Sequence, residues 1–138
     1  MINLKDYINQ KELISLLSEC IYPNEERVLQ EYEQYRNDKS RKLLGRIENG
    51  ELVGLIGVIN QTENEVELKH IAIKSSKRKQ GLGKKLIKEF MQENSIRRIE
   101  AETDMDAVDF YRKIGFQIIR LGEKYPGIER FKCILTKD

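Results

Sequence analysis

The segment that most constrains the fold spans residues 71–87, where an apolar run is followed by a basic loop and two glycines. This pattern predicts a strand that ends near Ile73 and a helix that begins at Gly81. A helix N-terminus presents unpaired N–H groups and a partial positive charge, and glycine lets the backbone approach an anion closely. Residues 77–88 include six basic side chains and no acidic one. The segment therefore predicts a binding site for a phosphate or pyrophosphate group.

Two common nucleotide-binding motifs do not account for this loop. The sequence has no GxxxxGK[ST] motif, and the GxGxxG fingerprint fails because Leu86 stands where its third glycine belongs. A solvated charged surface and a nucleic-acid patch are the other interpretations of so many basic residues. The basic run contains no aromatic residue that would stack on a base. We therefore rank a phosphate-bearing cofactor first, a solvated surface second and nucleic acid third.

The remaining sequence predicts helices and strands around this segment. The hydrophobic period is helical over 9–21, 25–38, 81–94 and 106–113. Strand-like segments are 2–4, 41–48, 51–59, 65–73, 98–103, 116–121 and 130–136. Asn49-Gly50 predicts a hairpin turn, Pro23-Asn24 ends the first helix, and 122–127 is expected to be a loop. An antiparallel run followed by strand–helix–strand–helix–strand predicts an α/β (α+β) domain with a mixed sheet covered by helices.

Two motifs resemble those of the Gcn5-related N-acetyltransferase (GNAT) family. Arg78-x-x-Gly81-x-Gly83 is similar to the family's acetyl-CoA pyrophosphate loop. Residues 107–116, AVDFYRKIGF, are similar to its second signature, A-x-x-F-Y-x-x-x-G-F. The order of predicted elements also agrees over nearly the whole chain. The resemblance implies one N-acetyltransferase domain over 1–138, with a central mixed, mostly antiparallel sheet of about seven strands, about four helices and a bulge or splay at the fourth strand.

The resemblance also implies acetyl-CoA as the co-substrate, no metal, and a set of residues that contact the cofactor. These residues are Ile71, Ala72, Ile73, Arg78, Lys79, Gln80, Gly81, Leu82, Gly83, Lys84, Asp104, Phe110 and Tyr111. Asp104 departs from the family pattern, because many members carry asparagine three residues before the alanine. A carboxylate cannot donate the hydrogen bond that an asparagine amide would offer the cofactor.

The strand before the basic loop changes its inside–outside alternation. Val66 and Leu68 are apolar at even positions, whereas Ile71 and Ile73 are apolar at odd positions. A β-bulge near 69–70 would produce this slip, and so would a strand end that is buried on both faces. The resemblance implies a bulge that separates this strand from its parallel neighbour. Pantetheine would then pair with the backbone near Ile71 and Ile73, and a freed N–H near Ile71 would polarise the acetyl carbonyl.

An amine must lose a proton before it attacks a thioester. An alkyl ammonium has a pKa of about 10.4, so freeing its lone pair at pH 7 costs about 4.6 kcal/mol. Two residues of the cofactor strand are candidate bases. Glu67 stands where some family members carry a glutamate base, and His70, the sole histidine, has an intrinsic pKa of about 6.5. The alternatives are a surface carboxylate for Glu67 and an ordinary strand side chain for His70. We rank Glu67 slightly ahead of His70.

Tyr111 resembles the family's general acid, which protonates the departing coenzyme A thiolate. A phenol has a pKa of about 10 and a free thiol about 8.5, so full proton transfer is uphill by roughly 2 kcal/mol. We therefore expect the phenol to donate a hydrogen bond to the developing thiolate. The alternative is a helix tyrosine that packs beside Phe110 and Phe116, and Phe110 itself is expected in the core.

The leading hypothesis is an N-acetyltransferase that transfers an acetyl group from acetyl-CoA to a primary amine by direct attack in a ternary complex. Neither Cys20 nor Cys133 lies in a motif that suggests a covalent nucleophile or a metal site. The alternative is a non-catalytic acyl-CoA-binding or sensor domain, which would keep the glycine loop and lack the acid and the base. A nucleic-acid-binding module ranks third and predicts strongly salt-dependent binding.

Composition limits the partners and the location. The 138 residues carry a net charge of +2, which excludes a general polyanion binder. No apolar run approaches the roughly 20 residues of a membrane helix, the N-terminus lacks a secretory pattern, and both cysteines are expected to be reduced. We therefore expect a cytoplasmic protein without membrane or nucleic-acid partners; a homodimer is left open.

The acceptor is expected to be a small-molecule or peptide amine. In this family it usually meets the early helices and the last hairpin, here Tyr22, Glu25, Glu26, Tyr32 and the loop 122–127.

Overall fold

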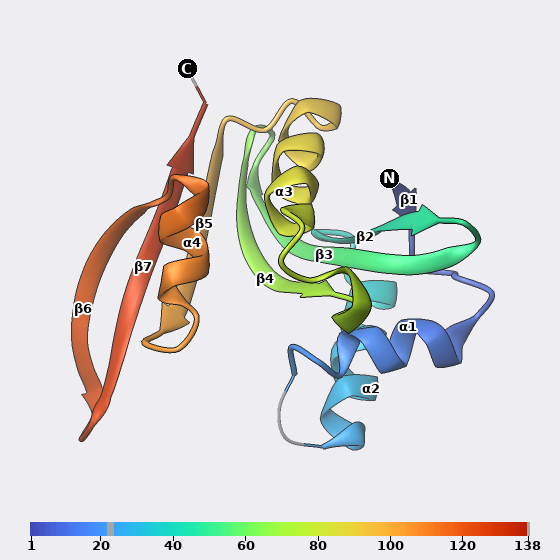
Figure 1. Cartoon of the computed structure of the whole chain (residues 1–138), viewed down its shortest axis with the longest axis horizontal. Coiled ribbons are helices and arrows are strands. Elements are labelled where there is room, and N and C mark those ends of the chain that lie inside the picture. Colours follow the sequence, from blue (N-terminus) through green and yellow to red (C-terminus); the bar gives the residue numbers. More distant parts are fainter. Residues whose placement is uncertain (22–23, 138) are drawn as a thin grey trace.

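The computed structural model describes residues 1–21 and 24–137, with the main chain alone at 124. In this part of the chain, seven strands form one sheet that four α-helices accompany (Figure 1). The strands are β1 (Ile2–Asn3), β2 (Arg41–Glu48), β3 (Glu51–Thr62), β4 (Glu65–Ile73), β5 (Arg98–Asp104), β6 (Gln117–Tyr125) and β7 (Ile128–Thr136). The helices are α1 (Gln10–Leu17), α2 (Glu25–Asn37), α3 (Leu82–Glu93) and α4 (Val108–Ile114), with a 3-10 turn, η1 (Ser75–Lys77).

The sheet is mixed and mostly antiparallel, which confirms the predicted fold class. Its strand order is β1-β2-β3-β4-β5-β7-β6, and among the described strands only β4 and β5 pair in parallel. The predicted Asn49-Gly50 turn joins β2 to β3, and both residues have positive φ (52° and 78°), as tight hairpin turns require. Within the described helices, none is long and apolar enough to cross a membrane.

Helices cover both faces of the sheet and bury two apolar cores. The core under α3 and α4 includes Val66, Leu68, Ile87, Phe90, Ile99, Val108 and Tyr111. The core under α1 and α2 includes Leu13, Leu17, Tyr35, Leu43, Leu55 and Ala72. Each helix contributes apolar side chains spaced three or four residues apart, so one stripe of every helix faces the sheet.

The bulge predicted in the cofactor strand is present in β4. Gly57 of β3 pairs with His70, but the next residue, Val58, pairs with Leu68. Lys69 is therefore an extra residue. Before it, even-numbered side chains of β4 enter the core under α3 and α4; after it, they face the core under α1 and α2. The bulge thus reverses the faces of all residues that follow.

β4 and β5 separate after a short contact. Their parallel pairing is limited to Glu65–Glu67 with Arg98–Glu100. Beyond this contact, β4 continues to pair with β3 as far as Ile73, and β5 continues to pair with β7 as far as Asp104. Figure 1 shows the two ribbons diverging, with α3 beside β3 and β4 and α4 beside β5 and β7. In the described chain, the β5-facing edge of β4 therefore has no strand partner beyond Glu67.

The first helix is shorter than the predicted 9–21. α1 ends at Leu17, and the chain continues in turns closed by bonds between residues three apart, such as the Cys20 N–H to the Leu17 carbonyl (3.2 Å). This tighter turn keeps the local hydrophobic spacing while it ends the α-helix. Pro23, which was expected to end the helix, and Tyr22 lie outside the described residues.

Several strands extend beyond their predicted bounds. β3 runs on to Thr62, and the expected loop 122–127 belongs mostly to strands, because β6 reaches Tyr125 and β7 begins at Ile128. Gly122 has φ 83° and lies at a register shift between β6 and β7. A glycine in a strand often marks a bulge, and Gly122 does so here, whereas the sequence pattern predicted a loop at this position.

Gly57 gives a direct test of how α2 packs on the sheet. A Cβ at this position would lie 2.1 Å from the Tyr35 hydroxyl oxygen. We expect Gly57→Ala to lower the free energy of unfolding by about 1–3 kcal/mol, because the added methyl displaces a buried ring. Urea unfolding measures the loss. Gln61→Ala, on an exposed part of the same strand, is the control and should change stability by less than about 0.5 kcal/mol. Equal stability of the two variants would contradict the packing.

Candidate active site

The loop between β4 and α3 ends in an uncapped helix N-terminus. Gly81 is the N-cap of α3 in the left-handed conformation (φ 76°), and Lys79 is also left-handed (φ 63°). No side chain in the described chain caps this helix, and its first intrahelical bond runs from the Lys85 N–H to the Gly81 carbonyl. The N–H groups of 82–84 are therefore available to an anion.

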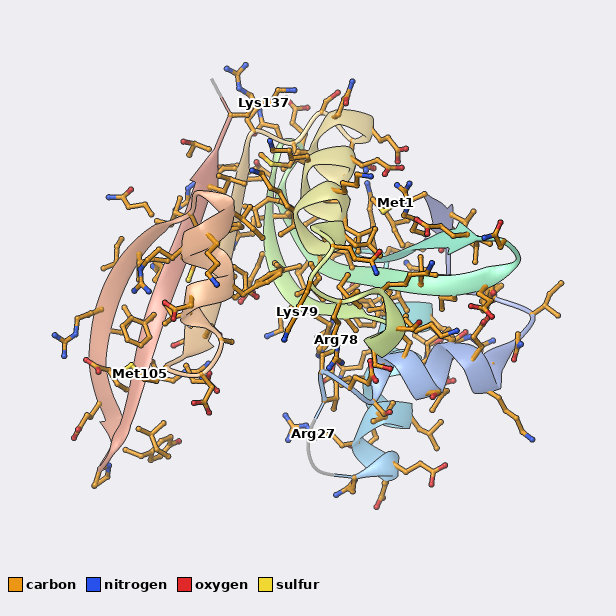
Figure 2. The ribbon with its side chains drawn as sticks, viewed as in Figure 1. Met1, Arg27, Arg78, Lys79, Met105 and Lys137 are labelled. Atoms are coloured by element: carbon orange, nitrogen blue, oxygen red, sulfur yellow. The ribbon has the colours of Figure 1, made fainter. Side chains whose placement is uncertain are left out.

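Arg78 connects this loop to two other parts of the chain. Its Nε donates to the Ile73 carbonyl (3.1 Å), and a terminal nitrogen donates to the Glu19 carboxylate (3.0 Å). Figure 2 labels Arg78 and Lys79 in the loop that joins β4 to α3. Because half of the Arg78 side chain is exposed, its pair with Glu19 is weak, and an anionic ligand can replace Glu19 at little cost.

The two glycines of the loop have different structural roles. Gly81 has open space around its Cα and supplies the positive φ at the start of α3. Gly83 is buried, and a Cβ there would lie 2.7 and 2.8 Å from two atoms of the Phe110 ring. Phe110 belongs to α4, so Gly83 allows α3 and α4 to meet across the separation of β4 and β5. Gly83 thus serves helix packing, a role that the sequence did not indicate, while its N–H group stays among those available to an anion.

Asp104 has a local structural function at the end of β5. One of its carboxylate oxygens accepts hydrogen bonds from the Asp106 and Ala107 N–H groups, both at 3.0 Å. These bonds form the turn that leads into α4. A carboxylate oxygen and an amide oxygen can both accept such bonds, which explains how aspartate can stand where the resembling family often has asparagine.

The bulge places both candidate bases on one face of β4. Glu67 lies between Val66 and Leu68, whose side chains enter the core under α3 and α4, so it points to the opposite face. His70, beyond the extra residue, contacts Tyr35 of α2 and therefore faces the same way. Glu67 is half-buried and forms an ion pair with Lys69, with 4.0 Å between the charged atoms.

His70 is held neutral. The Tyr35 hydroxyl lies 2.6 Å from its Nδ1 atom. Burial lowers the pKa of His70 to about 4, with an opposing contribution from the Glu31 carboxylate. A neutral imidazole is therefore expected at pH 7, and this ring takes up a proton less readily than the ordinary histidine pKa used in the prediction would imply.

Tyr111 lies on the α3–α4 side, opposite the two candidate bases. Its ring packs edge to face against Phe110 and Phe116, with centroid distances of 5.1 and 5.2 Å. In the described chain its hydroxyl hydrogen-bonds no other group, although only 8% of the residue is exposed. Burial raises the pKa of Tyr111 above its usual value. The phenol therefore keeps its proton and is a hydrogen-bond donor with an open position.

The main-chain N–H of Ile71 lies beside Cys20, in the turn after α1. Burial raises the pKa of the Cys20 thiol to about 12, and the Ile71 N–H opposes this rise. The thiol itself donates to the Leu17 carbonyl (3.3 Å). The Ile71 side chain packs against the core that contains Tyr111, so Ile71 lies between Cys20 and that core. The sequence pattern does not indicate this arrangement, because Cys20 has the spacing of a helix-face residue.

Only some of the residues expected to contact an acceptor are exposed on the surface. Glu25 and Glu26 are exposed at the start of α2. Tyr32 is buried, and its hydroxyl donates to the Lys5 carbonyl (3.0 Å), so it holds the N-terminal segment against α2. A groove of about 650 Å³ lies between α1 and the start of α2 and includes Glu25 in its lining. None of the expected cofactor residues lines this groove.

The contact between Gly83 and Phe110 predicts coupled effects on stability. We expect Gly83→Ala to cost about 1–3 kcal/mol of unfolding free energy, because its methyl overlaps the Phe110 ring. In a Phe110→Leu background the same change should cost at least about 0.5 kcal/mol less, because the obstructing ring is gone. A double-mutant cycle in urea measures the difference. Additive effects would show that the two residues do not constrain each other.

Comparison with known proteins agrees with this geometry. The family described as acetyltransferase (GNAT) domain matches residues 6–131. A relative from Bacillus methanolicus, described as an uncharacterized N-acetyltransferase in the lysA 3′ region, is 38% identical over 82 residues, or 57% of this chain and 67% of the relative.

Solved structures show the same fold. An aminoglycoside 6′-N-acetyltransferase complexed with coenzyme A has a TM-score of 0.78 at 21% identity, covering 98% of this chain and 94% of that one. The ribosomal-protein-S18-alanine N-acetyltransferase of Escherichia coli has a TM-score of 0.72 at 14% identity, covering 95% and 89%. Since the family match spans most of the chain and includes both signature motifs, the protein belongs to the GNAT acetyltransferase family.

Proposed function

We propose that residues 1–138 form a single N-acetyltransferase domain, which transfers an acetyl group from acetyl-CoA to a primary amine by direct attack in a ternary complex. The observation that carries the proposal is the separation of β4 from β5 beyond Glu67. It leaves an unpaired edge of β4 between an uncapped helix N-terminus and the free hydroxyl of Tyr111. The coenzyme A bound in the similar aminoglycoside 6′-N-acetyltransferase supports the same ligand class here.

The cofactor would lie along the edge of β4, with its pyrophosphate at the start of α3. The N–H groups of 82–84 would bind the phosphates, and Arg78, Lys79, Gln80 and Lys84 would surround them. Pantetheine would pair with the main chain of 71–73, as an added strand does at an open sheet edge. Leu82, which is buried, anchors the helix under this site.

The acid and base groups approach the thioester from opposite faces of the sheet. Glu67, on the face toward α1 and α2, would take the proton of the acceptor ammonium, directly or through water. The amine lone pair would then form the C–N bond as the C–S bond breaks, and the second proton that the nitrogen must lose would pass through water to the coenzyme A thiolate. The Ile71 N–H would donate to the acetyl oxygen, which gains negative charge. Tyr111, on the other face, would donate a hydrogen bond to the departing thiolate.

The acceptor is proposed to be a small-molecule or peptide amine. The similar structures include an enzyme named for an aminoglycoside and one named for the alanine of a ribosomal protein, so both kinds of amine fit this fold. A matched screen of acceptors would offer a 6′-amino aminoglycoside, an alanine-starting peptide and a lysine peptide, and would measure thiol release.

A cytoplasmic location is also proposed, supported by Cys20 and Cys133, which are both free thiols.

Gly81 allows a charge-only test of the phosphate site. Asparagine and aspartate tolerate its left-handed conformation similarly and cap helices similarly, but only aspartate adds a negative charge. We expect Gly81→Asp to weaken acetyl-CoA binding at least about tenfold relative to Gly81→Asn, because a carboxylate repels the pyrophosphate. Calorimetry at fixed ionic strength measures both affinities. Equal affinities of the two variants would show that the phosphates do not bind at the start of α3.

Tyr111→Phe separates an enzyme from a binding-only domain. The substitution keeps the ring packing and removes the hydroxyl, so stability should be preserved. We expect kcat to fall about 10- to 100-fold with little change in acetyl-CoA affinity, because a hydrogen bond to a charged group contributes roughly 1.5–3 kcal/mol. Steady-state thiol release and calorimetry give the two numbers. Tight acetyl-CoA binding by the parent protein without transfer to any amine would favour the sensor alternative.

A further inference from the structure

One hydrogen bond ties α2 to the bulge of β4 and is not used by the transfer described above. The Tyr35 hydroxyl oxygen lies 2.6 Å from His70 Nδ1, and the two rings meet edge to face with centroids 5.6 Å apart. Tyr35 is fully buried, and Gly57, which pairs with His70, leaves the room that the hydroxyl occupies. The positions of both rings are therefore fixed by packing on α2, β3 and β4.

The burial of Tyr35 determines which atom carries the shared proton. Burial raises the pKa of Tyr35, so its phenol keeps a proton, and His70 Nδ1 is its hydrogen-bond partner in the described chain. If Nδ1–H donated to the phenol oxygen, the buried O–H would lack an acceptor, at a cost of roughly 1–3 kcal/mol. If the phenol donates to Nδ1, both groups are satisfied and the ring proton lies on Nε2.

Burial is the main reason why the ring does not gain a second proton, and the charges around the pair do not reverse its effect. The charged or titratable groups that face it are Cys20, Arg27, Glu31, Arg41, Glu67 and Lys69. Glu31 favours the imidazolium, but its carboxylate is bonded to Arg41 (3.1 Å), whose guanidinium also lies over the Tyr35 ring (5.3 Å). Arg27 and Lys69 add further positive charge near His70. The surroundings thus favour an imidazole that is neutral and protonated at Nε2.

We propose that Tyr35 is a positioning residue that holds His70 as a neutral Nε2–H donor, so that His70 binds an oxygen of the acceptor while Glu67 alone takes the proton of the amine. This inference rests on the proposed N-acetyltransferase function. It follows from the bulge, which puts Glu67 and His70 on one face of β4, and from the direction of the Tyr35 hydrogen bond. The acceptor would then carry a hydroxyl, carbonyl or carboxylate oxygen close to its amine.

Nitrogen NMR tests the protonation state without any acceptor. Because His70 is the sole histidine, protein made without a histidine tag and labelled with ¹⁵N-histidine gives one pair of ring signals. The expected spectrum has an unprotonated Nδ1 and a protonated Nε2, with no titration from pH 8 down to pH 5. A protonated Nδ1, or a titration midpoint near the ordinary value of about 6.5, would overturn the proposal.

Tyr35→Phe is the matched variant, since it keeps the ring and removes the hydroxyl. With Nδ1 no longer engaged, both tautomers should appear and the midpoint should rise toward the ordinary value. An unchanged spectrum would show that Tyr35 does not set the tautomer. These measurements use the free protein, so they decide the protonation state of His70 whether or not any amine is acetylated. A failure of the proposed N-acetyltransferase function would be seen in the acceptor screen and not in these spectra.

Kinetics with the best amine of the acceptor screen test the division of roles. His70→Gln retains an N–H donor and should keep kcat within about threefold, whereas His70→Leu should raise the KM for the amine about 3- to 10-fold. Glu67→Gln should lower kcat about 100-fold or more, because it removes the group that takes the proton of the amine. A comparable loss of kcat in His70→Gln would make His70 the base and overturn the proposal.

Discussion

The structure depends on one extra residue in β4. Lys69 has no partner on β3, so the side chains before and after it alternate in opposite phase. This change of phase puts Glu67 and His70 on the face toward α1 and α2, while Ile71 packs with the core that holds Tyr111. Without the bulge, a strand with the same sequence would point one of these groups to the wrong face. The pairing of β4 with β5 ends at Glu67, two residues before Lys69, and this leaves the edge along which a thioester can pair.

Two glycines determine how closely the helices pack around β4. Gly57 lets Tyr35 of α2 reach the bulge, and Gly83 lets α3 meet Phe110 of α4. In both places the aromatic ring occupies the volume that a side chain would otherwise fill. The helices on the two faces are therefore held at fixed positions relative to β4, which is what a site built from several elements requires.

The sequence was sufficient for features that depend on local pattern. The glycines after β4 located the start of α3, and Asn49-Gly50 located a hairpin. The slip between Leu68 and Ile71 indicated where a bulge would lie, and the family resemblance favoured the bulge over a strand end buried on both faces. It was insufficient where a residue's role depends on its tertiary neighbour. Tyr35 has the spacing of an ordinary core residue, and nothing in its own segment indicates that its hydroxyl meets His70. The role of Gly83 likewise depends on α4, which lies more than twenty residues away in the chain.

The central claim is that the open edge of β4 binds acetyl-CoA, and residue-resolved amide hydrogen exchange tests it most directly. In the free protein, N–H groups of β4 that face β5 beyond Glu67 should exchange quickly, because no strand partner protects them. Saturation with acetyl-CoA should slow exchange within 71–73 and at 82–84, and leave 65–67 unchanged. Binding that protects other segments and leaves 71–73 as exposed as before would contradict the account.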